Sequence, residues 1–145
     1  MRILGVDFGS KRIGLAISDE TGTVAQPVGY VTGGVNEVLR VATDRGAGRI
    51  VVGLPRRLDG TASEQTRRTQ EFMDALKRAT TLPIESWDER LTTAQAERVL
   101  LEGDVRRAER KQKRDQLAAT ILLQSYLDAR QEIRNPTLEI RDKPE

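Results

Sequence analysis

The stretch RILGVDFGSKRIGLAIS (residues 2–18) contains two apolar runs, at residues 2–8 and 12–18, separated by a short turn at residues 9–11. Two such runs around a short glycine-containing turn are typical of a β-hairpin. Asp7 stands at the end of the first run, where an ionised carboxylate is costly unless a cation meets it. The sequence therefore begins with a predicted hairpin that carries an acid at its end.

Strands and helices alternate after this hairpin. Residues 24–32 (VAQPVGYVT) predict a third strand, which Pro27 places at a sheet edge or a bulge. Residues 49–55 are apolar without alternation, as in a strand covered on both faces. The remaining predicted elements are a strand at 82–90 and helices near 35–46, 58–79, 92–103 and 114–133.

This order predicts an α/β fold with a mixed five-stranded sheet and helices on both faces. The 145 residues suffice for one domain, which we expect to span residues 1–132, followed by a loose tail at 133–145. We find no secretion signal and no apolar run that approaches the length of a membrane span, so we expect a cytoplasmic protein that makes no membrane contact.

The chain has no histidine and no cysteine. Their absence excludes thiol nucleophiles, Ser-His catalysis and the usual zinc sites. Any metal would be held by oxygen ligands, which favours Mg²⁺ or Mn²⁺.

Three acidic positions could supply such ligands. Asp7 ends the first strand, and Asp88 and Glu89 end the strand at 82–90, where strand alternation points the two side chains to opposite faces. Asp115 is in helical register with Ala119, Leu122 and Tyr126, the stripe expected to face the sheet. Each acid also has an ordinary interpretation: a turn residue at Asp7, a strand end paired with Arg90, and an i,i+4 pair of Asp115 with Lys111. Together they are what a two-metal site for phosphodiester cleavage requires.

Basic residues are unevenly distributed, although the net charge is only +2. Such clusters favour binding to a phosphate backbone. The alternative interpretation is that they are solvated helix faces that bind no ligand. The stretch at 104–114 is expected to be a mobile loop. The candidate phosphate-binding residues are Lys11, Arg12, Arg56, Arg57, Arg90, Arg106, Arg107, Arg110, Lys111 and Lys113, with Arg114 and the pair Arg67 and Arg68 as further basic positions.

The aromatic residues are few and scattered: Phe8, Tyr30, Phe72, Trp87 and Tyr126. We expect all five to pack in the core. Recognition of a nucleic acid would then depend on shape and backbone contacts, because base-stacking platforms need exposed aromatic side chains.

Four motifs resemble the YqgF/RuvX family in order and spacing: GVDFGSKRIGLAISD, VVGLPRRLDGT, WDERLTTAQA and KRDQLAATILLQSYL. The resemblance covers residues 2 to about 128 and implies an RNase H-like, RuvC-related fold. It also implies a metal-dependent nuclease with acids at Asp7, Glu89 and Asp115, and leaves open whether Asp88 or Glu89 is the ligand. The other motif positions are Arg12, Gly53, Pro55, Gly60, Arg90, Thr92 and Thr93.

The family is described in two ways, so the resemblance implies either maturation of the 5′ end of pre-16S rRNA or resolution of Holliday junctions in DNA recombination and repair. Expected partners are pre-16S rRNA, a four-way DNA junction or ribosomal particles, and the protein is expected to be a monomer or a homodimer. A third hypothesis is a non-catalytic RNA-binding factor in ribosome assembly, whose acids could be neutralised with little loss of function. The opening also looks like the phosphate motif of actin-like ATPases, but the chain is too short for their second domain.

Overall fold

The computed structural model describes residues 1–57, 59–91 and 107–134, and within the last helix the side chains of residues 117–131. The strands are β1 (Arg2–Phe8), β2 (Ile13–Ser18), β3 (Ala25–Val31), β4 (Ala47–Leu54) and β5 (Ile84–Asp88). The helices are α1 (Val35–Asp44), α2 (Glu64–Ala79), the single 3₁₀ turn η1 (Glu89–Leu91) and α4 (Arg107–Arg134).

The five strands form one mixed sheet in the order β3-β2-β1-β4-β5. β1 pairs antiparallel with β2 through partners such as Asp7 and Gly14, as the predicted hairpin requires. β4 and β5 are parallel to β1, so the carboxyl ends of β1, β4 and β5 meet at one end of the sheet. Asp7, Asp88 and Glu89 lie at that end of the sheet.

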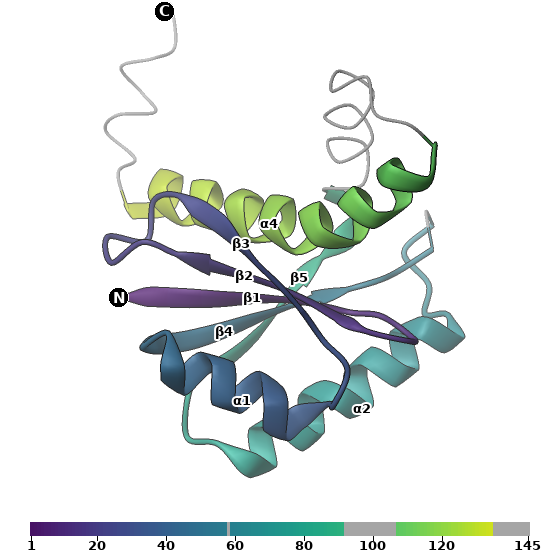
Figure 1. Cartoon of the computed structure of the whole chain (residues 1–145), viewed down its shortest axis with the longest axis horizontal. Coiled ribbons are helices and arrows are strands. Elements are labelled where there is room, and N and C mark those ends of the chain that lie inside the picture. The colour runs from purple at the N-terminus through teal and green to yellow at the C-terminus, as the bar shows by residue number, and fades with distance from the viewer. Residues whose placement is uncertain (58, 92–106, 135–145) are drawn as a thin grey trace, which may run out of the picture.

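Helices cover both faces of the sheet, as predicted (Figure 1). α1 and α2 lie on one face, where Leu4, Val6 and Val52 pack against Val38 and Leu76. α4 crosses the other face, whose buried cluster consists of Ile3, Ala16, Val51, Ala119, Leu123, Tyr126 and Leu127. The predicted stripe of Ala119, Leu122 and Tyr126 is buried against the sheet.

Local sequence signals explain several boundaries. Ser63 caps α2: its side chain accepts a hydrogen bond from the Thr66 amide, and the Thr66 hydroxyl accepts one from the Ser63 amide. Pro27 lies on β3, the edge strand, at a register shift in its pairing with β2, which confirms the expected edge or bulge.

The expectation of a loop across the basic stretch is wrong for residues 107–114. These residues are the first turns of α4, which begins seven residues before the predicted start at 114. The segment RAERKQKR contains only Ala, Arg, Glu, Lys and Gln, all strong helix formers, and no glycine or proline interrupts it. α4 also runs to Arg134, two residues beyond the expected end of the domain. The helix predicted at 92–103, the start of the basic stretch at 104–106 and most of the tail lie outside the described residues.

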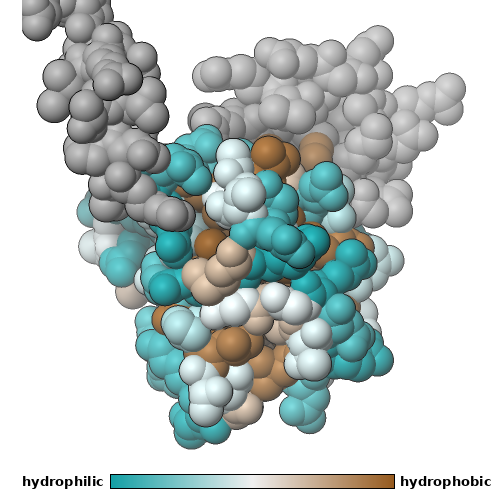
Figure 2. Space-filling model, turned by 90° about the vertical axis from the view of Figure 1, so that its left-hand side faces the viewer, coloured by the Kyte–Doolittle hydropathy of each residue, from teal (hydrophilic) through white to brown (hydrophobic). Residues whose placement is uncertain are grey.

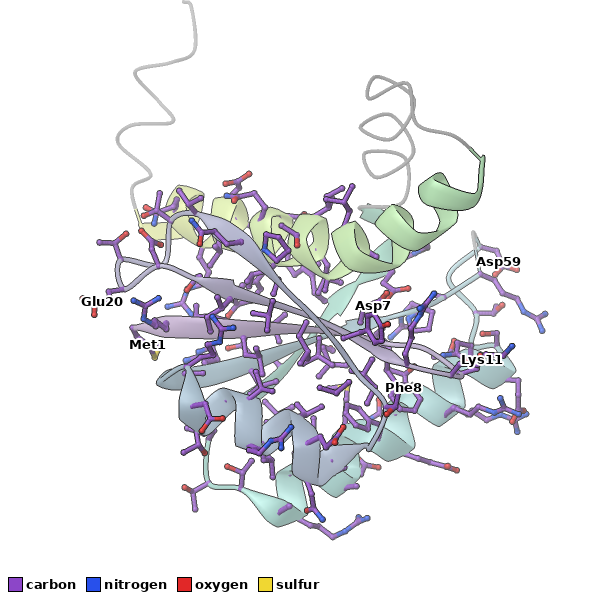
Figure 3. All side chains as sticks on the ribbon, in the orientation of Figure 1. Met1, Asp7, Phe8, Lys11, Glu20 and Asp59 are labelled. Carbon is purple, nitrogen blue, oxygen red and sulfur yellow. The ribbon has the colours of Figure 1, made fainter. Side chains whose placement is uncertain are left out.

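In the described part of the chain, no helix is long and apolar enough to cross a membrane. The end of the molecule that carries the N-terminus shows mostly hydrophilic residues around smaller hydrophobic groups (Figure 2). The turn between β1 and β2, which contains Lys11, lies at the opposite side of the molecule (Figure 3).

Candidate active site

Asp7 lies on the face of the sheet that α4 covers. Ile3 belongs to the cluster under α4, and Gly5 is so close to this helix that a Cβ atom there would lie 2.8 Å from the Cβ of Leu123. Asp7 follows at the next position of the same face, as strand alternation predicts. Figure 3 labels Asp7 near the middle of the view, where the strands cross.

Glu89 reaches the same place from β5. It begins the turn η1 and lies over Gly53 of the neighbouring strand, where a Cβ atom would be 2.7 Å from Oε1 of Glu89. The missing side chain at Gly53 therefore makes room for this carboxyl group.

Burial, followed by a hydrogen bond with Asp7 and the negative charges of Asp7 and Asp88, raises the pKa of Glu89 to about 9. Glu89 therefore keeps its proton near neutral pH, because a second negative charge so close to Asp7 is unfavourable. Asp7 and Glu89 thus form a coupled pair that a cation would stabilise in its fully ionised form.

Asp88 has a different environment. Its carboxylate accepts hydrogen bonds from Nε and Nη2 of Arg90, the latter at 2.7 Å, and these bonds lower the pKa of Asp88. Arg90 in turn lies beside Gly60 in the loop that follows β4. Of the two acids that the sequence left open, Glu89 lies against Asp7 and Asp88 is bonded to a guanidinium group.

The structure places Asp115 on α4, one turn before the buried Ala119. Its side chain lies outside the described part of α4. Among the side chains that are described, no group of three or more acids is arranged to hold a metal ion.

A hollow of about 560 Å³ adjoins Asp7. The turn between β1 and β2 forms one side of it, and Gly14 of β2 lies beneath. The remaining lining residues are Gly9, Ser10, Lys11, Arg12, Tyr30 and Thr32. Two of the candidate phosphate-binding residues, Lys11 and Arg12, therefore lie next to the first acid.

The other basic candidates are spread more widely. Arg56 and Arg57 are exposed in the loop after β4, where Arg56 donates a hydrogen bond to the Gly60 carbonyl oxygen. Arg107, Arg110, Lys111 and Lys113 are in the first turns of α4, and Arg106 lies outside the described residues.

Tyr30 is a further residue of this site that the sequence does not indicate. Its expected burial is wrong, because the residue is 46% exposed and lines the hollow beside Asp7. The register Asp7, Gly14, Tyr30 across three strands could have indicated this position, but the length of the β2–β3 connection does not fix that register.

The donor set fits a hard divalent cation. Asp7 and Glu89 offer only oxygen atoms, and the raised pKa of Glu89 indicates that burial and the neighbouring acids disfavour a second negative charge there. Mg²⁺ or Mn²⁺ would relieve that repulsion, whereas the chain contains no thiolate or imidazole for a softer metal.

Comparisons with known proteins identify the family of the chain. Residues 1–129 match the family model described as "RuvX: Holliday junction resolvase". A protein of Thermoanaerobacter pseudethanolicus is 44% identical over 135 residues, which cover 89% of this chain and 97% of its own. One from Symbiobacterium thermophilum is 46% identical over 90% of this chain and 94% of its own. Both are named "Putative pre-16S rRNA nuclease".

Among solved structures, RuvC of T. thermophilus in complex with a Holliday junction substrate superposes with a TM-score of 0.56. The sequences are 16% identical, and the match covers 90% of this chain and 96% of RuvC. At that identity the likeness establishes the fold, which is the RNase H-like fold expected from the sequence. The family match over residues 1–129 and the relatives that are 44% and 46% identical over about nine-tenths of the chain show the family: the chain belongs to the RuvX family.

Proposed function

We propose that this protein is a divalent-metal-dependent nuclease that cleaves phosphodiester bonds in structured RNA, with the 5′ end of pre-16S rRNA as its substrate. The observation that carries the proposal is the coupled pair of Asp7 and Glu89, held between the sheet and α4 beside a hollow with two cationic side chains. The proposed substrate is taken from the names of the relatives, which are pre-16S rRNA nucleases by name.

Asp7, Glu89 and, from α4, Asp115 would hold Mg²⁺ or Mn²⁺. When bound, such ions activate water and stabilise the charge on the leaving oxygen. Lys11 and Arg12 hold the phosphate backbone beside Asp7, because both line the hollow that opens there. Asp88 positions Arg90 through its paired hydrogen bonds, which makes it an orienting residue in this proposal.

The test is cleavage of a pre-16S rRNA 5′-leader fragment with Mg²⁺ or Mn²⁺ present. Wild type should cut the fragment, and Asp7→Asn and Glu89→Gln should lose at least a hundredfold in rate. Asp74→Asn provides a matched control, since Asp74 is an exposed acid on α2, on the opposite face of the sheet. This variant should cut at the wild-type rate.

A four-way DNA junction tested in parallel decides between the two substrates. The family description and the RuvC likeness make DNA the second candidate. Preferential cutting of the junction would show that the substrate is DNA and not RNA. Symmetric resolution of a junction would also require two active sites, and therefore a dimer. Binding without cleavage, equal in wild type and Asp7→Asn, would instead support a non-catalytic assembly factor.

A further inference from the structure

Tyr30 of β3 is in register with Asp7 of β1, with one β2 residue between them. Asp7 pairs with Gly14 of β2, and Gly14 pairs with Tyr30 of β3, so the three residues form one row. Residues paired in this way point to the same face. Ala16, two residues after Gly14, packs under α4, so the row faces the same side as the candidate active site.

Glycine in the middle of the row leaves the space between Asp7 and Tyr30 open. Two strand spacings separate the outer residues, about 10 Å between their backbones. All three line the same hollow. A ligand that lies over Gly14 would thus touch Asp7 at one end and Tyr30 at the other.

Tyr30 is an exposed ring with a cation stacked on it. The guanidinium carbon of Arg12 lies 4.9 Å from the centre of the ring. The ring nevertheless stays 46% exposed, whereas its neighbour Val31 packs into the core on the other face. An exposed aromatic ring and a stacked guanidinium group are the two kinds of surface on which unpaired nucleobases stack.

We propose that Tyr30 and the guanidinium group of Arg12 form a stacking platform for one unpaired base of the substrate, next to the phosphate that Lys11 and Arg12 hold beside Asp7. The inference rests on the proposed nuclease function and narrows its substrate class: the strand has an unpaired nucleotide beside the cut. A fully paired duplex or junction offers no unpaired base for Tyr30.

Binding measured without metal tests this directly, because no cleavage occurs. The probe is a short single-stranded RNA with 2-aminopurine at successive positions, whose fluorescence is quenched by stacking. Wild type should quench the probe. Tyr30→Ala should bind it about tenfold more weakly and lose the quenching, as expected for the removal of one stacked base. Tyr30→Phe and Tyr30→Trp should stay within about twofold to threefold of wild type, because they keep the ring.

Two controls separate stacking from general effects. Val24→Ala removes another exposed apolar side chain, 50% exposed in the β2–β3 connection, and should bind as wild type does. A blunt RNA duplex should bind wild type and Tyr30→Ala equally. Equal binding of the single strand by both proteins, or an equal loss for strand and duplex, would overturn the platform.

The outcomes also distinguish the platform from the nuclease. If wild type binds and cuts but Tyr30→Ala behaves identically, only the platform fails. If wild type binds with the predicted dependence on Tyr30 but never cuts, the platform stands and the nuclease proposal fails. If wild type binds no nucleic acid, both are overturned.

Discussion

At the scale of single residues, Glu89 makes the protein's stability depend on pH. Its pKa of about 9 in the folded state exceeds its ordinary value of 4.5, because burial and Asp7 disfavour the charge. Between these values the folded state binds more protons than the unfolded state, so stability falls as pH rises. The contribution is fully present below pH 4.5 and is lost as pH rises through 9.

Glu89→Gln should remove most of this dependence. The neutral amide cannot ionise, so we expect the free energy of unfolding at pH 8 to rise by on the order of 2 kcal/mol in metal-free buffer. Urea denaturation at several pH values between 5 and 9, with EDTA present, measures the effect. A slope as steep in the variant as in wild type would show that another group is responsible.

The same pair of acids predicts stabilisation by a divalent cation. Anything that binds only the folded state raises the melting temperature, and a cation is expected to bind where Asp7 and Glu89 repel each other. Millimolar Mg²⁺ or Mn²⁺ should therefore raise the melting temperature of wild type at pH 8, and chelation should reverse the shift. Asp7→Asn should show a much smaller shift, and an undiminished one would place the ion elsewhere.

At the scale of elements, Gly53 sets the distance between β4, η1 and α4. A Cβ atom at this position would crowd both Glu89 and the buried Leu122. Gly53→Ala should cost about 1 to 3 kcal/mol of stability and reduce cleavage about 10- to 100-fold through displacement of Glu89. Gly5→Ala is the matched control, since its Cβ atom would crowd Leu123 without touching Glu89. Equal losses of cleavage in the two variants would argue against a special role for Gly53.

Gln124 joins α4 to the start of β3 through two side-chain hydrogen bonds. Its side-chain carbonyl accepts a hydrogen bond from the Ala25 amide, and its NH₂ group donates one to the Thr23 carbonyl oxygen, both at 2.9 Å. Gln124→Ala should lower the free energy of unfolding by about 1 to 2 kcal/mol. Gln70→Ala, on the exposed surface of α2, should change it by less than about 0.5 kcal/mol. Chemical denaturation of both variants checks this difference.

Much of this architecture can be predicted from local sequence. The hairpin, the buried β4 strand and the capped α2 helix each depend on residues close together in the chain, such as Ser63 and Thr66. The buried face of α4 could be predicted as well, because the spacing of Ala119, Leu122 and Tyr126 indicates one face of a helix.

The rest depends on contacts that local patterns do not contain. Whether Asp88 or Glu89 meets Asp7 is decided by Arg90 and by the space over Gly53, neither of which strand alternation alone reveals. Tyr30 was assigned to the core because isolated aromatic residues usually pack there. The start of α4 was missed because a run of cations predicts solvent exposure, and exposure is compatible with both loop and helix.

At the scale of the whole molecule, the basic residues at the start of α4, and Arg106 just before them in the sequence, predict a salt-dependent affinity for nucleic acid. Substitution of Arg106, Arg107, Lys111 and Lys113 by Gln should weaken nucleic-acid binding and reduce the slope of log K against log salt by up to about 3. Arg67→Gln with Arg68→Gln, on α2 at the other face, serves as the control. An unchanged slope in the fourfold variant would remove these residues from the binding surface.

The placement of α4 also has a consequence for the order of synthesis. Asp7, the hairpin and β5 are all translated before this helix, whereas in the described part of the chain the face they share is covered by Ala119, Leu123, Tyr126 and Leu127 of α4. A nascent chain that has not reached Leu127 exposes Ile3 and Val51 and lacks the helix that closes over its acids. The face of the sheet that carries Asp7 is therefore covered late in synthesis, once α4 has left the ribosome.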